Sequence, residues 1–216
     1  MVLGDLKAWT NQFVTADERV LGRISVIWPK CLAKLTSQPE EDLITINLVD
    51  ALWKDQIIRR ICLWIEYQFE PFGTKPDGSK FSKGKIDIAL FLEQDREHYI
   101  AYECKRLNVT YGGTRSSLAT VYVTQGMMRF MTEQYAEALP IGCMLGYVVD
   151  GDIPFAVAQL DNVIKAHQPL GLLAGPTKAT PVHGVERFSA LSREGRRLDR
   201  DKCGLDFESG YGSHRK

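Results

Sequence analysis

The sequence predicts an α/β protein whose mixed central sheet is flanked by helices. Two observations lead to this class. Apolar residues recur at helical spacing in some segments and alternate, or run continuously, as in strands in others. The segments follow one another as helix, three strands, helix, strand and helix, and two of the strands are apolar on nearly both faces. Strands of that kind lie inside a sheet that helices cover.

Residues 1–39 are weakly patterned. Four apolar residues at helical spacing predict one short helix: Leu3, Leu6, Trp9 and Phe13. Pro29 and Pro39 interrupt the pattern that follows. We expect residues 1–39 to form an extension that packs on the core.

The predicted core, residues 40–168, begins with a helix over residues 40–53. Its first residues are acidic, and acidic side chains oppose the partial positive charge of a first helical turn. Apolar residues then recur at roughly helical spacing: Leu43, Ile46, Leu48, Val49, Leu52 and Trp53.

Three strands are expected next. Residues 61–70 are rich in aromatic and β-branched side chains, which favours a strand. Residues 71–85 are rich in Gly, Pro and Ser and predict a loop. A strand over residues 85–92, a polar turn over 93–97 and a strand over 98–105 follow.

The second half alternates helices and strands. Gly112–Gly113 breaks the chain, and Ser116 or Ser117 could cap a long helix over residues 118–139, which Pro140 would end. Methionines and a phenylalanine of this helix are expected in the core: Met127, Met128, Phe130 and Met131.

The last predicted elements are a buried strand over residues 141–149 and a helix over 154–167. Residues 169–216 have no convincing period and predict a loop-rich tail. Its basic cluster is interspersed with acids and reads as a solvated face: Arg193, Arg196, Arg197, Arg200 and Lys202.

The composition excludes several classes. Of 216 residues, 44% are hydrophobic and 25% charged, which excludes a disordered polyampholyte, a collagen-like repeat and a disulfide miniprotein. The 27 basic residues balance 27 acidic ones, which tells against charge-driven nucleic-acid binding by the whole surface but permits a local basic face. No apolar run approaches the roughly 20 residues of a membrane span. The first residues lack the pattern of a secretion signal, and five scattered cysteines favour reduced thiols, so we expect a cytoplasmic protein.

Asp87 and the triplet from Glu103 to Lys105 are the candidate catalytic residues. On a strand, alternate side chains share a face, so Glu103 and Lys105 point together while Cys104 points away. If the polar turn is centred on Asp95, Asp87 lies directly across from Glu103. Opposed residues have Cβ atoms about 4.5–5.5 Å apart, and like charges placed so are destabilising.

Two negative charges that face each other across the strands predict a metal site. Two carboxylates between apolar strands cost free energy unless something neutralises them, and a divalent cation would do so. Oxygen ligands suit Mg²⁺ or Mn²⁺. Lys105 could then orient a water or stabilise charge developing on a phosphate. An acid-x-Lys triplet alone means little, because Asp5 to Lys7 matches it too. In the alternative interpretation, Glu103 and Lys105 form a surface ion pair and the Asp87 strand lies at an exposed sheet edge.

Residues 86–88 and 102–105, in this order of elements, resemble the PD-(D/E)xK nuclease superfamily with its restriction-endonuclease-like fold. The resemblance covers about residues 40–149. Ile86 stands where that superfamily commonly has a proline before the aspartate.

The resemblance implies roles for the motif residues. Asp87 and Glu103 would bind Mg²⁺ with help from the backbone carbonyl of Cys104, and Lys105 would position the hydrolytic water. An acidic residue of the first core helix often completes such sites, and here Glu41 is the candidate, with its neighbour Glu40 as the alternate.

The helix after the motif strand offers two further polar residues. Gln125 invites comparison with the Gln-x-x-x-Tyr motif of the RecB-like branch, but residue 129 is Arg, so that branch is not supported. Gln125 and Arg129 could touch the site or a phosphate, or could simply be exposed.

A lysine-rich loop precedes the Asp87 strand and is almost uncompensated by acids: Lys75, Lys80, Lys83 and Lys85. Such lysines could contact the phosphate backbone, which positions a nucleic acid without reading its sequence; the alternative is a solvated surface. Arg106 and Arg115 flank the motif strand as secondary candidates. The histidines, among them His98, show no metal-ligand spacing.

The expected function is Mg²⁺-dependent hydrolysis of DNA phosphodiester bonds. The resemblance implies a context of microbial or phage nucleic-acid defence or processing. A neutral enzyme of this kind could rely on a homodimer or a partner subunit for its hold on DNA. Two alternatives stay open: a nuclease-fold binding or assembly subunit without turnover of its own, and a metal-dependent RNase.

Overall fold

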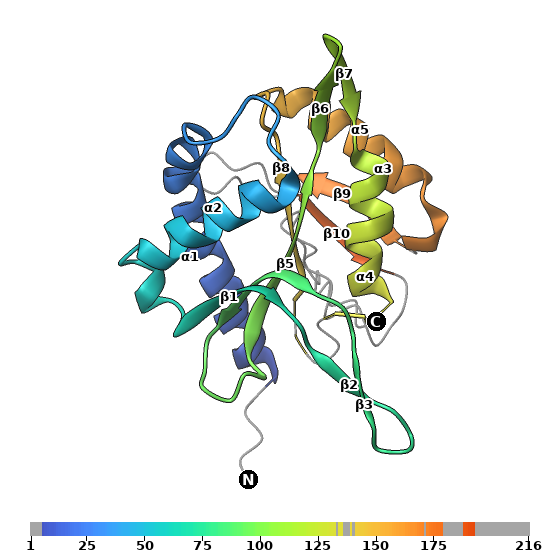
Figure 1. Cartoon of the computed structure of the whole chain (residues 1–216). Coiled ribbons are helices and arrows are strands. Elements are labelled where there is room, and N and C mark those ends of the chain that lie inside the picture. Colours follow the sequence, from blue (N-terminus) through green and yellow to red (C-terminus); the bar gives the residue numbers. More distant parts are fainter. Residues whose placement is uncertain are drawn as a thin grey trace, which may run out of the picture.

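A computed structural model describes residues 6–132, 134–135, 139, 141–170, 172–178 and 188–192. It is a mixed α/β structure with helices on both faces of a four-stranded sheet (Figure 1). Helices α1 (Leu6–Leu32) and α2 (Glu41–Lys54) lie on one side, and the helices that follow the sheet's third strand lie on the other. The predicted fold class is confirmed at this level.

The central sheet contains the four predicted strands, three of them shortened and β5 shifted by one residue: β1 (Trp64–Phe69), β4 (Ile86–Phe91), β5 (Tyr99–Arg106) and β8 (Cys143–Tyr147). Their order is β1-β4-β5-β8. The first two pairings are antiparallel and the β5–β8 pairing is parallel, so the sheet is mixed. Strands β4 and β5 are central and almost wholly buried, as their apolar sequences predicted.

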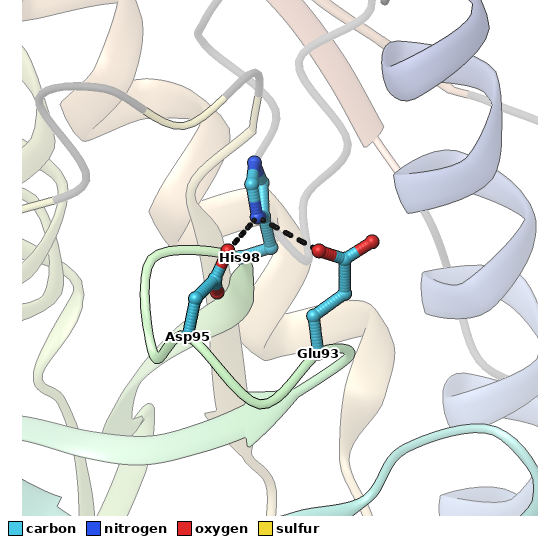
Figure 2. A group of neighbouring side chains, drawn as sticks. All are labelled: Glu93, Asp95 and His98. Carbon is cyan, nitrogen blue, oxygen red and sulfur yellow. Dashed lines mark hydrogen bonds and ion pairs between the residues drawn. The ribbon is translucent and has the colours of Figure 1, made fainter.

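The predicted register of β4 and β5 is confirmed. Ile88 pairs with Tyr102 and Phe91 with Tyr99, so the connecting turn is centred on Asp95. This polar turn brings three side chains together at its exposed end (Figure 2): Glu93, Asp95 and His98. The ladder ends at Ile88 and Tyr102, one residue before the predicted pair of Asp87 and Glu103.

The prediction of a short amino-terminal helix was wrong, because α1 spans 27 residues. The expectation stopped at Phe13, but apolar residues continue at helical spacing and are buried: Phe13, Ala16, Val20, Leu21, Ile24 and Ile27. Pro29 does not end the helix, which continues for three more residues to Leu32. The Tyr102 hydroxyl donates to Asp17 Oδ1 at 2.5 Å, which ties α1 to β5.

Helix α2 matches the prediction within one residue and buries Ile44, Leu48 and Leu52. The Thr45 and Tyr147 hydroxyls lie 3.2 Å apart, so α2 also contacts β8. A short 3₁₀ turn, η1 (Ile58–Arg60), then leads into β1.

The predicted loop over residues 71–85 contains a small antiparallel hairpin, β2 (Phe72–Thr74) and β3 (Lys80–Ser82). Its turn is closed by Gly78, at φ +85°, and by Asp77, whose side chain accepts from the Ser79 N–H at 2.9 Å. The sequence predicted a turn-rich loop here but not the two short strands that the turn joins.

A second hairpin surrounds the expected chain break: β6 (Asn108–Tyr111) and β7 (Thr114–Ser117). Gly112 and Gly113 both have positive φ, at 55° and 81°. Two central residues of that kind are what a tight hairpin turn requires.

The helix predicted over residues 118–139 is shorter and irregular. It consists of α3 (Ala119–Val121), the π-helix η2 (Tyr122–Met127) and α4 (Met128–Met131). Ser117 Oγ accepts from the Ala119 N–H, but the N-cap residue is Leu118, so neither predicted serine is the cap residue itself. The helix ends at Met131 rather than near Pro140, because the chain turns inward to bury Tyr135 against Phe130.

Helix α5 (Ile153–Ala166) lies within one residue of its prediction and begins at Asp152, which accepts from the Phe155 N–H. After η3 (Gln168–Leu170), the predicted loop-rich tail instead contains a two-stranded antiparallel sheet, β9 (Leu172–Lys178) and β10 (Phe188–Ser192). The basic cluster from Arg193 to Lys202 lies outside the described residues.

The core collects apolar side chains from both faces of the sheet. The methionine-rich segment of the irregular helix packs into it as predicted: Met127, Met128, Phe130 and Met131. Four cysteines are buried: Cys31, Cys62, Cys104 and Cys143. Within the described ranges, no helix combines the length and the apolar character that crossing a bilayer requires.

Candidate functional site

The candidate site lies where β4 and β5 stop pairing. The ladder between them ends at Ile88 and Tyr102, so the following N–H groups of β5 have no partner in β4. Asp87 Oδ2 accepts from the Cys104 N–H at 2.7 Å, and Glu41 Oε2 accepts from the Arg106 N–H at 2.9 Å. Two carboxylates therefore take the place of the missing strand partner at this edge of β5.

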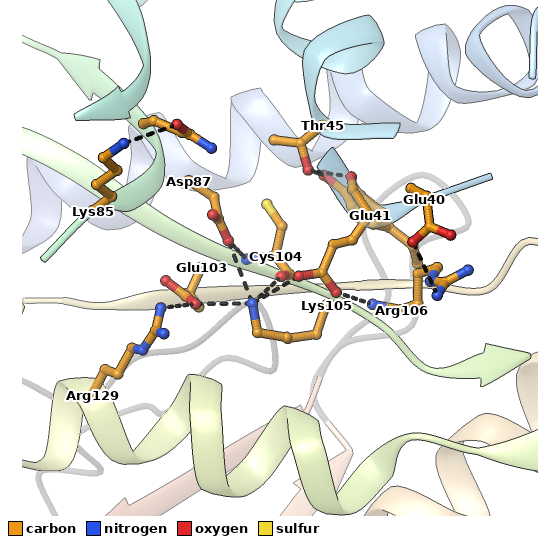
Figure 3. A network of polar contacts seen from close by, with 12 residues as sticks. Glu40, Glu41, Thr45, Lys85, Asp87, Glu103, Cys104, Lys105, Arg106 and Arg129 are labelled. Carbon is orange, nitrogen blue, oxygen red and sulfur yellow. Dashed lines mark hydrogen bonds and ion pairs between the residues drawn. The ribbon is translucent and has the colours of Figure 1, made fainter. Parts of the chain in front are cut away.

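The ammonium group of Lys105 lies among the carboxylates (Figure 3). Its Nζ is 2.9 Å from Glu41 Oε1, 3.0 Å from Glu103 Oε1 and 3.8 Å from Asp87 Oδ2. It also donates to the backbone carbonyl of Cys104 at 2.8 Å. The predicted residues thus meet around one cation of the chain itself.

Glu103 is the most deeply buried of these acids, with a side chain that is 0% exposed. Its Oε1 accepts from Arg129 Nη1 at 2.5 Å, whereas its Oε2 is buried and has no hydrogen-bond partner among the described residues. Burial, together with the neighbouring charge of Asp87, raises the pKa of Glu103 to about 7. Burial also raises the pKa of Asp87.

The pKa of Lys105 is affected by burial and by charge in opposite directions. Burial acts to lower its pKa, but the carboxylates of Glu103 and Asp87 outweigh that effect and raise the pKa above its ordinary value. Lys105 is therefore protonated at neutral pH.

The acids outnumber the bases in this cluster. Glu41, Asp87 and Glu103 face Lys105 and Arg129, so one negative charge lacks a counterpart. A proton on Glu103 or an added cation would supply the missing positive charge. Carboxylate and carbonyl oxygens are the donors that Mg²⁺ and Mn²⁺ prefer.

The helix over the site approaches the sheet closely at Gly126. A Cβ atom there would lie 2.3 Å from Met144 Cε and 3.6 Å from Lys105 Cγ. Gly126 belongs to η2, and π-helical segments recur at functional sites. The absence of a side chain at residue 126 lets η2 cover the apolar stem of Lys105.

The structure brings together Glu41, Asp87, Glu103 and Lys105, along with the Cys104 carbonyl. Glu40, the alternate to Glu41, is not part of the cluster: its side chain is 85% exposed and lies 3.8 Å from Arg106. The alternative interpretation as a surface ion pair at an exposed edge was wrong, because β4 and β5 are the central strands and Glu103 is buried.

The predicted substrate-binding residues lie around this cluster rather than in it. Lys80 is exposed and donates to Thr74 within the β2–β3 hairpin, and Lys85 lies 3.4 Å from Gln68 at the start of β4. Lys83 follows the hairpin, and Gln125 is exposed on η2.

The two arginines that flank the motif strand contact other parts of the chain. The guanidinium of Arg106 donates to the Pro39 carbonyl at 2.9 Å. Arg115 pairs with Asp150 at 2.7 Å and with Asp152, so acidic side chains compensate its charge.

Two features were missed or undervalued in the sequence. Arg129 was considered both as a residue that touches the site and as an exposed one, and the structure pairs it with Glu103 while Gln125 is exposed. The turn with Glu93, Asp95 and His98 was read only as polar, because His98 lacks a second histidine at ligand spacing.

That turn holds a compact group of possible ligands (Figure 2). His98 Nδ1 lies 3.0 Å from Asp95 Oδ2 and 3.3 Å from Glu93 Oε2, and the three ligand atoms are all within 4.8 Å of one another. In the part of the chain that the structure describes, no other three acidic, histidine or cysteine residues meet so closely. The carboxylates around Lys105 are thus more widely spaced than those of the turn.

Comparison with known proteins gives no relative: no family model, no curated protein and no solved structure matches this chain.

Proposed function

We propose that this protein is a Mg²⁺-dependent deoxyribonuclease with a restriction-endonuclease-like core. The observation that carries the proposal is the meeting of Asp87, Glu103 and Lys105 where two central strands separate, with Glu103 Oε2 buried and without a hydrogen-bond partner. A buried carboxylate oxygen without a donor is costly, and active sites commonly retain such groups.

The donor set fits a hard divalent cation. Asp87, Glu103 and the carbonyl of Cys104 would hold the ion, with Glu41 nearby. When bound, Mg²⁺ would neutralise the carboxylates and the negative charge that develops on a phosphate during hydrolysis.

The remaining chemistry belongs to the chain itself. Lys105 is protonated at neutral pH, so it acts as a hydrogen-bond donor and a positive charge rather than as a base. It can orient a water or a phosphate oxygen, and the carboxylate of Glu41 at 2.9 Å holds it in position. Arg129 reaches Glu103 from the helix and is 34% exposed, so its guanidinium can also meet a phosphate.

One observation favours a second candidate, a nuclease-fold binding or assembly subunit without turnover of its own. Lys105 and Arg129 already offset two of the three carboxylates, and a stable ion-pair network of this kind needs no metal.

Cleavage of plasmid DNA with Mg²⁺ or Mn²⁺ tests the proposal. We expect nicking or linearisation by the unaltered protein and loss of at least a hundredfold in rate for Asp87→Ala and for Lys105→Ala. Asp161→Ala and Lys165→Ala are matched controls, because they remove an exposed Asp–Lys pair on α5. Activity that survives both site substitutions rejects the mechanism, and absence of cleavage with every metal favours the binding subunit. An RNA substrate in parallel tests the RNase alternative.

A further inference from the structure

The β2–β3 hairpin carries exposed aromatic side chains next to the candidate site. It projects from the sheet below α4 (Figure 1). Phe72 is 66% exposed and Phe81 is 41% exposed. Single exposed hydrophobic side chains are common on protein surfaces, so the charged surroundings of these rings decide whether they form a binding site.

The two rings lie on opposite faces of the ribbon. Phe81 pairs with Gly73, and its ring covers the glycine so closely that a Cβ there would lie 2.3 Å from Phe81 Cζ. The backbone therefore fixes one side of this ring. Phe72 precedes Gly73 in the strand, so its side chain points to the other face.

The hairpin is locally basic. Residues 72–85 contain Lys75, Lys80, Lys83 and Lys85 against the single acid Asp77, in a chain whose basic and acidic residues balance overall. Lysine is depleted in the core of protein–protein interfaces. Exposed rings among lysines are instead the combination that binds single-stranded nucleic acid, because bases stack on the rings and phosphates meet the ammonium groups.

Lys80 shares a face with Phe72. Thr74 pairs with Lys80, and Thr74 lies two residues from Phe72, so the three side chains are on one side of the ribbon. One face thus offers a ring for a base and an ammonium group for a phosphate.

Hydrogen bonds connect the base of the hairpin to residues near the candidate site. Gln134 Nε2 donates to the Lys83 carbonyl at 2.8 Å, and the Tyr135 hydroxyl donates to the Lys85 carbonyl at 2.5 Å. The same hydroxyl lies 3.2 Å from Nη1 of Arg129, which binds Glu103. A nucleic-acid strand bound to the hairpin would therefore lie at a fixed position relative to the carboxylates of the candidate site.

We propose that the β2–β3 hairpin binds an unpaired segment of the DNA substrate, with a base stacked on Phe72 and a phosphate contacted by Lys80 on the same face. This inference rests on the proposed nuclease function and narrows its substrate to DNA that contains a single-stranded part.

Fluorescence anisotropy tests the binding in EDTA, where cleavage does not interfere. The probes are a labelled single-stranded oligonucleotide and the corresponding blunt duplex. We expect the unaltered protein to prefer the single strand, and Phe72→Ala to weaken that binding about fivefold or more while leaving duplex binding unchanged. Phe72→Trp retains a stacking surface and should restore affinity.

Tyr111→Ala is the matched control, because Tyr111 is an 88% exposed ring on the other hairpin, β6–β7. Equal single-strand affinity of Phe72→Ala and the unaltered protein overturns the inference, as does an equal loss in Tyr111→Ala. A dimer in sedimentation that Phe72→Ala converts to a monomer also overturns it, because the ring would then contact a second copy of this chain.

The outcomes for the two proposals are separable. Cleavage that depends on Asp87 but is indifferent to Phe72 and to strandedness leaves the nuclease and rejects the role of the hairpin. Single-strand binding that depends on Phe72, without cleavage under any metal condition, rejects the nuclease and leaves a single-strand-binding protein.

Discussion

The carboxylate of Asp87 accepts a hydrogen bond from the backbone N–H of Cys104 at 2.7 Å. This contact replaces a ladder bond at the point where β4 leaves β5. It fixes the Asp87 side chain at the middle of the Glu103–Lys105 segment. The separation of two central strands, rather than a loop, therefore creates the candidate site.

Divalent cations should stabilise the folded protein through Asp87. An ion that binds only the folded state at a hundredfold excess over its Kd adds about 2.7 kcal/mol, or roughly 5–10 °C in Tm for a chain of this size. We expect this shift with Mg²⁺ or Mn²⁺ in the unaltered protein and its loss in Asp87→Ala, measured by thermal unfolding.

The turn cluster provides the competing site for that measurement. A variant with alanine at Glu93, Asp95 and His98 should keep the full shift. If this variant loses the shift and Asp87→Ala keeps it, the ion binds at the turn and the assignment to the carboxylates around Lys105 is wrong.

The stability of the metal-free protein should fall as the pH rises from about 4.5 to 7. The pKa of Glu103 is raised from its ordinary 4.5 to about 7, so the folded state holds a proton that the unfolded state has released over this window. The corresponding loss in the free energy of unfolding is roughly 3 kcal/mol. Urea unfolding in EDTA at several pH values measures it.

Glu103→Gln should flatten this dependence, because the amide keeps the shape of the side chain without a titrating group. The variant should be at least as stable as the unaltered protein at pH 8. Superimposable pH profiles of the two proteins would show that Glu103 is not the group responsible.

Arg129→Ala should destabilise the metal-free protein by about 1.5–3 kcal/mol at pH 8, the range for a hydrogen bond to a charged group. The reason is that Arg129 lies 2.5 Å from the buried Oε1 of Glu103. Lys165→Ala breaks an exposed pair of the same 2.5 Å length with Asp161 and should cost less than about 1 kcal/mol. If both variants lose the same free energy of unfolding in denaturant, burial does not strengthen the contact of Arg129 with Glu103.

Tyr102→Phe should weaken the fold without changing the chemistry of the site. It removes the donor at 2.5 Å from Asp17 Oδ1, a carboxylate that is buried between α1 and the sheet. A loss of about 1–3 kcal/mol in unfolding free energy is expected. The cleavage rate at low temperature should be retained, and a large fall in rate for folded Tyr102→Phe would link this contact to the site.

The central sheet could be predicted because its signals are local. Aromatic and β-branched runs identified the strands, and the polar turn centred on Asp95 set the register of β4 against β5. That register predicted that Asp87 and Glu103 lie together, whereas Glu41 was named only through the family resemblance; the structure brings Lys105 close to both Glu41 and Asp87.

The remaining features depend on contacts between distant segments. Spacing alone predicted a regular helix to residue 139, but burial of Tyr135 ends it early. The ion pair of Arg129 with Glu103 arises only when the helix folds over β5. The neutralisation that the sequence assigned to a metal is supplied in part by the ion pairs of Lys105 and Arg129 with Glu103.

The lack of a side chain at Gly126 affects both the packing of the core and the surroundings of Lys105. The same residue allows η2 to rest on Met144 of the core and on the stem of Lys105. A Cβ atom there would have to displace the terminal methyl group of Met144, whereas it would be in ordinary van der Waals contact with Lys105 Cγ. The flexible end of Met144 can move to admit a small side chain, so the residue at position 126 affects the packing of the interior before it affects the stem of Lys105.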